Sequence, residues 1–349
     1  MPVTLQNPFR GAGLPGLTEF PRSSSQVVGA LLALCPVYER TPLIDAAAVA
    51  ADLGIAGLQI KDERQRMGLG SFKALGAAFV IAHDASEVVR GDAWEQALRG
   101  RTYVAASAGN HGLSVAAGAR IFGAQAVIYL AETVPEAFAR RLRDMGAQVV
   151  RAGANYEASM EAAAQAADAN DWTLLSDSSW PGYIEVPTRV MEGYVQLAAE
   201  IVAQMVTPPS HILLQAGVGG LAAAVAVKAR AAWGEAPKII VVEPDQAPAL
   251  ADSIRAGALV ETQGGVSNMG RLDCKTPSLV ALAGLARDAD YFVTISDAEA
   301  ERGVAVMAQQ GFASTPSGAA GLAALIAGLP EIGPEAQVLA ILSEGPEDA

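Results

Sequence analysis

Residues 211–221 read His-Ile-Leu-Leu-Gln-Ala-Gly-Val-Gly-Gly-Leu, an apolar run followed at once by a glycine-rich turn. The apolar run predicts a buried strand over 211–215, and the alanine-rich stretch after it predicts a helix over 221–233. Glycines between a strand and a helix let backbone N–H groups approach an anion, and the helix dipole favours negative charge there. Close packing of the helix on the strand would explain the same glycines. The candidate phosphate ligands are Gly217, Val218, Gly219 and Gly220.

This turn differs from two well-known nucleotide-binding motifs. Its spacing is G-x-G-G rather than G-x-G-x-x-G, and Glu243 is a weak substitute for the acid that binds ribose in dinucleotide-binding folds. No Gly-Lys-Ser/Thr follows the turn, as a P-loop requires. A nicotinamide-dependent dehydrogenase is therefore a disfavoured interpretation.

The chain from Thr41 onward alternates short β-rich runs with longer alanine-rich helical patterns, which is typical of βα units. We therefore expect an α/β fold with mostly parallel sheets flanked by helices, and more than one sheet. The expected strands are 57–60, 102–106, 126–130, 148–152, 173–175, 211–215, 238–243, 291–294 and 338–342. The expected helices include 135–145, 156–167, 221–233 and 297–309.

The same pattern predicts two domains. The βαβαβα run over 78–171 predicts a small domain, and residues 1–77 and 172–349 then form a large one. Ligands are expected in the cleft between the two, a preferred position for binding sites. Residues 1–36 show no clear period and are interpreted as an extended arm with a first short helix. Residues 253–277 are expected to form a loop over the cleft.

The composition excludes several classes of protein. The 349 residues carry 24 Lys plus Arg against 37 Asp plus Glu, a formal charge of −13, so we expect no nucleic-acid partner. The longest apolar stretch, 212–227, contains Gln215 and is too short for a membrane span. The first residues lack a secretory signal, and the cysteines Cys35 and Cys274 cannot by themselves form a disulfide framework or a metal cluster. We expect a cytoplasmic protein without a membrane partner or a metal.

A second candidate site surrounds Lys73, which follows Gly70-Ser71-Phe72 and begins an apolar helix. The strand before it ends at Lys61-Asp62-Glu63, with a glycine-containing loop between. Burial and the positive end of a helix both disfavour the ammonium form, so the pKa of Lys73 is expected to fall and its amine to become a nucleophile for Schiff-base chemistry. The alternative is a surface lysine whose amine reaches solvent.

A third candidate site, Ser107-Ala108-Gly109-Asn110-His111-Gly112, also lies between a strand and a helix. Its backbone N–H groups, the Ser107 hydroxyl and the Asn110 amide are suited to hold a carboxylate and an aromatic oxygen. His111 is a candidate base, but a structural histidine bonded to the backbone is the favoured interpretation.

In order and spacing, these motifs resemble those of the pyridoxal-phosphate enzymes with the tryptophan synthase β fold. The resemblance runs from about residue 36 to 345 and includes 41–43, 70–73, 107–112, 145–150, 217–220 and 343–345. It implies an α/β fold of two domains with mostly parallel sheets. It also implies that pyridoxal 5′-phosphate lies in the cleft between them, with 1–77 and 172–349 as the large cofactor-binding domain and 78–171 as the small domain.

Within that superfamily, the sequence is most similar to the diaminopropionate ammonia-lyases. Serine and threonine dehydratases usually lack the block Asp177-Ser178-Ser179-Trp180-Pro181-Gly182-Tyr183. The other similar segments are 61–64 with its long spacer to Lys73, 187–188, 191–194 and 270–274.

The resemblance implies roles for individual residues. Lys73 joins the cofactor covalently, Asn110 bonds its ring hydroxyl, and the neutral Ser343 hydroxyl faces its pyridine nitrogen, which suits β-elimination because the ring is then a weaker electron sink. The base that takes the Cα proton is Lys73 itself or Asp177. Asp177 alternatively binds and protonates the β-amine, unless it only caps a local turn. The implied cofactor-binding residues are Phe72, Lys73, Asn110, Gly217, Val218, Gly219, Gly220 and Ser343, and the implied substrate-binding residues are Ser107, Ala108, Gly109, His111 and Asp177.

Three further residues complete the prediction. Ala108 stands where the ammonia-lyases often carry an acid, so the resemblance implies that the base used on D-isomers is missing. Glu344 is a candidate contact of the ring or of a substrate amine, and equally a candidate solvated acid. Cys274, with no His or second Cys nearby in sequence, is interpreted as a structural thiol.

Together these features predict a homodimeric, pyridoxal-phosphate-dependent lyase that converts 2,3-diaminopropionate to pyruvate and ammonia by α,β-elimination. The acidic Asp177 favours a cationic β-amine over a neutral hydroxyl by charge complementarity. The nearest enzymatic alternative is a dehydratase of serine, threonine or 3-hydroxyaspartate. An alternative of a different class is a protein that binds the cofactor or an amino acid without turnover.

Overall fold

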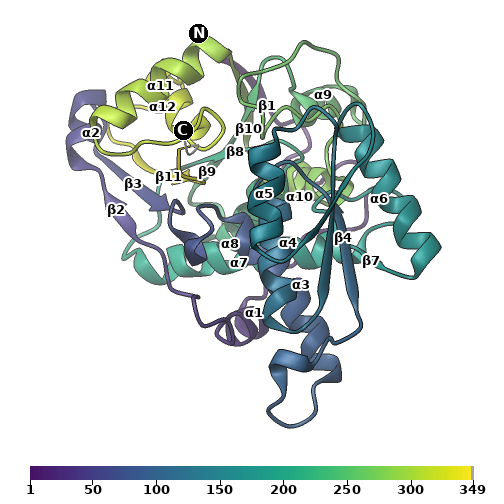
Figure 1. Ribbon diagram of the computed structural model, residues 1–349. Helices are drawn as coiled ribbons and strands as arrows, with labels where there is room; N and C mark the ends of the chain where they lie inside the picture. Colours follow the sequence, from purple (N-terminus) through teal and green to yellow (C-terminus); the bar gives the residue numbers. More distant parts are fainter. Residues whose placement is uncertain (347–349) are drawn as a thin grey trace.

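The computed structural model describes residues 1–346, which form two β-sheets with helices packed on their faces (Figure 1). The larger sheet has the strand order β1-β10-β9-β8-β11-β3-β2, in which β1 and β2 are antiparallel to their neighbours and the other pairs are parallel. Its strands are β1 (Val3–Gln6), β2 (Leu43–Asp45), β3 (Gly57–Asp62), β8 (His211–Gln215), β9 (Lys238–Pro244), β10 (Tyr291–Ile295) and β11 (Gln337–Leu342).

The central strands β9, β8 and β11 have apolar middle residues because both of their faces are buried, as parallel sheets require. In β8, Ile212 and Leu214 pack on one face while Leu213 packs on the other, following the two-residue period of a strand. The face of Ile212 is covered by α7 (Glu185–Gln204), α8 (Gly220–Trp233), α9 (Ala249–Ala256) and α10 (Leu279–Asp288). The opposite face is covered by α2 (Ala47–Leu53), α11 (Asp297–Gln309) and α12 (Ala320–Ala327).

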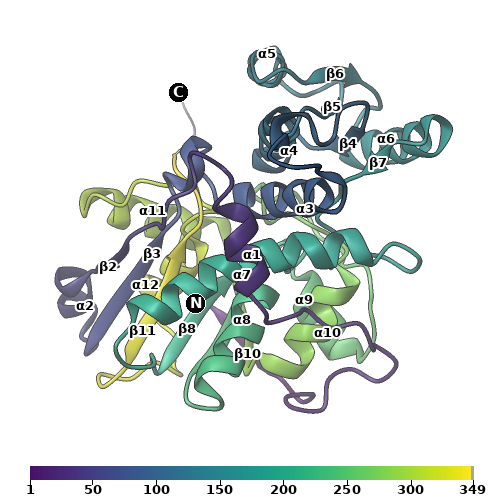
Figure 2. The ribbon, with the colours of Figure 1, turned by 90° about the horizontal axis from the view of Figure 1, so that it is seen from below.

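The smaller sheet is wholly parallel and has the order β6-β5-β4-β7. Its strands are β4 (Thr102–Ala106), β5 (Gln125–Leu130), β6 (Gln148–Arg151) and β7 (Thr173–Leu174), and its helices include α4 (Asn110–Ile121), α5 (Glu136–Asp144) and α6 (Tyr156–Asn170). Figure 2 shows this sheet standing apart from the larger one, with α3 (Lys73–Val88) between them beside α7. The short α1 (Gln26–Leu32) packs against α3 and α7.

The strands expected from the sequence all form, and two more join them. β1 lies in the stretch expected to be an extended arm, where Val3 pairs with Thr294 of β10. β2 pairs with β3 through Leu43 and Lys61. Both are short strands at the two edges of the sheet and are half exposed, so neither carries the apolar run that identifies a buried strand.

One expected boundary is wrong. The loop expected over 253–277 begins later, because α9 continues to Ala256 and ends at the left-handed Gly257. The strand β7, just beyond the small domain predicted over 78–171, pairs with β4 in the smaller sheet. Within residues 1–346, none of the helices combines the length and the hydropathy that a membrane crossing requires.

Candidate active site

Lys73 is the first residue of α3, and an unusual loop leads into it. Met67, Gly68 and Gly70 have positive φ angles of 52°, 70° and 80°, a conformation that is costly for a non-glycine residue such as methionine. The loop is tied to the segment that follows β11, since the Phe72 N–H donates to the Ser343 carbonyl at 3.1 Å. The position of Lys73 therefore depends on the segment at Ser343, which is distant in the sequence.

The amine of Lys73 forms an ion pair with the carboxylate of Asp177, and the two side chains are 25% and 14% exposed. Burial alone would lower the pKa of Lys73, but the carboxylate of Asp177 outweighs it and the pKa is raised. The prediction that the pKa of Lys73 falls is therefore wrong for the protein without cofactor. Burial likewise would raise the pKa of Asp177, but Lys73 and His111 hold it well below its ordinary value. The carboxylate is ionised at neutral pH.

Asp177 is positioned by the tyrosine of its own motif. The Tyr183 hydroxyl donates to the Leu174 carbonyl at 2.7 Å and accepts from the Ser176 N–H at 3.1 Å, so it closes the turn around the acid. The Trp180 ring stacks on Tyr183 with 4.4 Å between ring centroids. This block therefore acts as a rigid turn that presents Asp177 to Lys73.

The segment before α4 is organised by Ser107 and His111. The Ser107 hydroxyl accepts hydrogen bonds from the N–H groups of Gly109 at 3.2 Å and Gly112 at 3.0 Å, which ties the segment before α4 to the first turn of the helix. Buried His111 contacts the Leu175 carbonyl through Nε2 at 2.8 Å, and burial lowers its pKa. Its bond to the backbone is the one expected of a structural histidine.

The glycine turn after β8 is closely surrounded. Gly219 has a φ of 98°, which favours glycine, and it immediately precedes α8. A Cβ atom at Gly217 would lie 3.0 Å from the Cys274 Sγ atom and 3.1 Å from the Arg271 carbonyl oxygen. A side chain is thus excluded at Gly217, and the turn lies at the start of a helix, where backbone N–H groups favour an anion.

Cys274 lies at this site rather than in a remote loop. Burial raises the pKa of its thiol to about 11, and the charges of Lys73 and Asp177 both act on it. The residue is therefore a neutral thiol that packs against the glycine turn. Its interpretation as a structural thiol is compatible with this position.

Glu344, which follows β11, is buried and both of its carboxylate oxygens have polar partners. Glu344 is 4% exposed. Its Oε2 atom accepts from Asn110 Nδ2 at 2.5 Å and lies 3.0 Å from Arg271 Nε, while Oε1 accepts from the Thr315 hydroxyl at 2.5 Å. The alternative of a solvated acid is wrong. Glu344 links Asn110, the first residue of α4, to the loops that carry Arg271 and Thr315, and Ser343 beside it is also buried.

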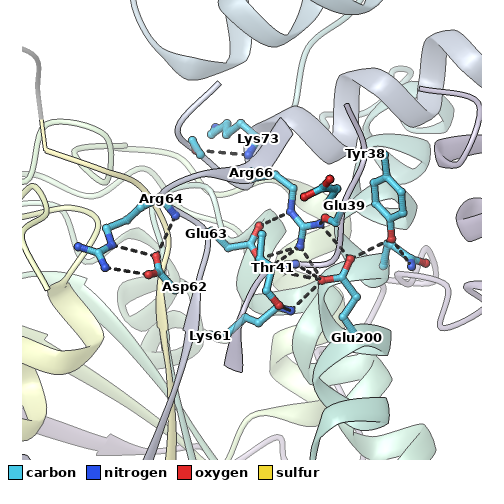
Figure 3. A network of polar contacts seen from close by, with 12 residues as sticks. Tyr38, Glu39, Thr41, Lys61, Asp62, Glu63, Arg64, Arg66, Lys73 and Glu200 are labelled. Atoms are coloured by element: carbon cyan, nitrogen blue, oxygen red, sulfur yellow. Dashed lines mark hydrogen bonds and ion pairs between the residues drawn. The ribbon is translucent and has the colours of Figure 1, made fainter. Parts of the chain in front are cut away.

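Figure 3 shows a buried ionic network beneath the lysine loop. Arg66 donates to Glu63 and to Glu200 of α7, each at 2.7 Å, and Lys61 donates to the same Glu200 oxygen at 2.7 Å. Burial would raise the pKa of Glu200, but Arg66 and Lys61 lower it. Thr41 completes the network by bonding Glu63 and Glu200. The network fixes the end of β3 and the start of the lysine loop to α7.

Comparison with known proteins identifies the class of this fold and site. Residues 34–344 match the family described as "Pyridoxal-phosphate dependent enzyme". The chain belongs to this family of enzymes, and the expected α/β fold of the tryptophan synthase β type is confirmed.

The more specific similarity is to ammonia-lyases. The chain is 31% identical over 316 residues to diaminopropionate ammonia-lyase of Salmonella typhimurium, covering 83% of this chain and 78% of that protein. It superposes with a TM-score of 0.88 on the crystal structure of diaminopropionate ammonia-lyase from Escherichia coli in complex with D-serine, at 28% identity and covering 99% and 94% of the two chains. It is 27% identical to L-threonine ammonia-lyase of Thermotoga maritima, covering 74% of this chain and 60% of that protein.

The residues present fit pyridoxal phosphate. An amine, that of Lys73, and an ionised acid, Asp177, lie together in a partly buried position. A Cβ atom at Gly220 would lie 4.0 Å from the Asp177 carbonyl oxygen, so the N-terminus of α8 lies close to the same acid. The chain therefore provides a covalent attachment point and an anion-binding turn side by side.

The structure also adds residues that sequence reasoning did not place. Arg271 lies within a segment of the family resemblance, but no role was expected of it. Thr315 carries no sequence signal, because it lies between elements and has no pattern around it. A cavity of about 300 Å³ opens at these two residues, beside Glu344. Tyr194, in the middle of α7, is a third such residue.

Proposed function

We propose that this enzyme is a lyase that converts 2,3-diaminopropionate and water to pyruvate and two molecules of ammonia. The proposal is supported most by the ion pair of Lys73 and Asp177 beside the glycine turn. The relatives named as diaminopropionate ammonia-lyases and the motif around Asp177 support the choice of substrate.

When bound, pyridoxal phosphate supplies an electron-withdrawing ring that makes the α-proton of an attached amino acid more acidic. In the proposed roles, Lys73 holds the cofactor through its Nζ atom, and Asp177 receives the Cα proton at a carboxylate oxygen. The same acid can return a proton to the departing β-nitrogen, which leaves as ammonia. The Asp177 carboxylate also attracts the cationic β-amine of the substrate.

The other predicted residues bind and orient in this proposal. Gly217, Val218, Gly219 and Gly220 hold the phosphate through their N–H groups and the start of α8, with Phe72 beside them. Asn110 bonds the ring hydroxyl through its amide, whose orientation Glu344 fixes by a hydrogen bond of 2.5 Å. Ser343 faces the ring nitrogen. The substrate carboxylate is bound where the chain enters α4, by Ser107, Ala108 and Gly109 before the helix and by His111 in its first turn.

The L-isomer is the proposed substrate. Ala108 is exposed, and its methyl group cannot remove a proton. Asp177 is then the base proposed to act at Cα. We propose further that the enzyme works in the cytoplasm as a homodimer. Sedimentation of the purified protein measures its oligomeric state.

The test is a panel of L- and D-2,3-diaminopropionate, L-serine, L-threonine and 3-hydroxyaspartate, with both products measured. Diaminopropionate releases two ammonia molecules for each 2-oxo acid, whereas the hydroxy amino acids release one. A ratio of two with the L-isomer supports the proposal. A ratio of one with a hydroxy amino acid, and no reaction of diaminopropionate, supports the dehydratase instead.

A further inference from the structure

Tyr194 has a buried hydroxyl group without a hydrogen-bond partner among the described residues. The residue lies in the middle of α7 and is 2% exposed. Burial and the charge of Asp177 raise the pKa of the phenol well above its ordinary value, so the group is a neutral donor. Buried tyrosine hydroxyls ordinarily find a partner, because an unpaired polar group in the interior is costly.

The surroundings of Tyr194 show that the ring is held in place. A Cβ atom at Gly76 of α3 would lie 2.6 Å from the ring, so the ring fits only because residue 76 is glycine. The Phe72 ring packs edge-on against it, with 4.9 Å between centroids. Tyr194 therefore cannot turn away to solvent to satisfy its hydroxyl.

The far side of the ring faces the start of α8. A Cβ atom at Gly220 would lie 3.6 Å from the Tyr194 Cε2 atom, and 4.0 Å from the Asp177 carbonyl oxygen. Gly220 is the first residue of α8, whose N-terminal N–H groups and dipole favour an anion. The unpartnered donor and the anion-binding turn are thus neighbours, although they come from different helices.

We infer that the Tyr194 hydroxyl donates a hydrogen bond to the phosphate group held at the start of α8. The inference rests on the proposed cofactor site and adds a side-chain donor to a set made only of backbone N–H groups. A donor that is buried and already oriented gains a charged acceptor when the cofactor binds. The unpaired hydroxyl then destabilises only the apoenzyme, because the phosphate accepts its hydrogen bond in the loaded enzyme.

The test compares the wild type with Tyr194→Phe in binding pyridoxal phosphate and pyridoxal, which lacks the phosphate. A hydrogen bond to a charged group corresponds to a loss of about ten- to hundredfold in affinity. We expect that loss for pyridoxal phosphate and less than about a threefold change for pyridoxal. Absorbance titration of the apoenzyme reports both constants without any turnover.

Thermal unfolding gives a second readout. Tyr194→Phe keeps the ring that packs on Phe72, so the apoenzyme should melt at the same or a higher temperature, while the rise on adding pyridoxal phosphate should shrink. A clear fall in the melting temperature of the apo variant would mean that the hydroxyl already has a partner, and would overturn the inference.

Tyr103→Phe is the matched control. Tyr103 is also buried, but its hydroxyl donates to Asp84 at 2.8 Å, so its loss should destabilise the apoenzyme and leave the ratio of the two affinities unchanged. Equal affinities for wild type and Tyr194→Phe, or an equal loss for both ligands, would overturn the phosphate contact. A wild-type protein that binds neither ligand would instead overturn the proposed function.

Discussion

The amine of Lys73 and the carboxylate of Asp177 are paired in the structure although 104 residues separate them in the sequence. Lys73 begins α3, and Asp177 follows the last strand of the smaller sheet. The pair therefore forms only when both sheets are in place. In it, the acid is ionised and the amine is protonated.

Replacing Asp177 by asparagine should lower the turnover of 2,3-diaminopropionate by about 10²- to 10⁴-fold, the usual contribution of a positioned acid or base. The visible absorption band of the bound cofactor should remain, because Lys73 is unchanged. Asp62→Asn is the control, since Asp62 bonds Arg64 and not Lys73. An unaltered rate in Asp177→Asn would contradict the role proposed for this residue.

Glu200→Gln should lower the free energy of unfolding by about 3–5 kcal/mol, because Lys61 and Arg66 would remain buried with one carboxylate instead of two. Urea denaturation measures this change. Glu185→Gln on the same helix is the comparison, because its 58%-exposed side chain pairs with a half-exposed Arg22 and should contribute less than about 1 kcal/mol. Similar small effects in the two variants would show that the network does not stabilise the fold.

Glu243 should make stability fall as the pH rises. It is buried, accepts hydrogen bonds from Leu250 and Ala251, and burial raises its pKa to about 8, against about 4.3 for an unfolded chain. The folded state thus holds a proton that the unfolded state has already lost. Its contribution is complete below about pH 4.3, falls as the pH rises, and is lost above about pH 8.

Glu243→Gln removes this titration and so isolates it. The difference in unfolding free energy between wild type and variant should therefore decline between about pH 5 and 8 and stay level above that range. Denaturation in urea at several pH values checks the trend. A difference that is constant with pH would show that Glu243 is ionised in the folded protein.

Gly193→Ala should disturb the crossing of α3 and α7. A Cβ atom there would lie 2.5 Å from the Leu75 carbonyl oxygen and 2.8 Å from the Gly76 Cα atom, so backbone would have to move. We expect a loss of about 1–3 kcal/mol in unfolding free energy. Gly29→Ala is the control, because its Cβ meets only the end of the flexible Gln196 side chain, and alanine favours a helix by up to about 1 kcal/mol.

The strands and candidate motifs could be predicted from the sequence because each depends on a pattern within a short stretch of residues. The middle residues of β8 and β11 are apolar, and the Ser107 and glycine-turn motifs each lie within a few residues. The protonation of Lys73 was not accessible, since its sign depends on a carboxylate that only the fold brings near. Burial of Glu344 depends on Arg271 and Thr315, which come from other loops. The orphan hydroxyl of Tyr194 could not be inferred, because an apolar helix face gives no information about hydrogen bonding.

The position of β11 between β8 and β3 has a consequence during synthesis on the ribosome. During synthesis β3 and β8 leave the ribosome long before β11. Until β11 is made, each of these two strands has an unpaired edge where β11 will bind. Such edges pair readily with other chains, so we expect the incomplete chain to be prone to aggregation until β11 inserts.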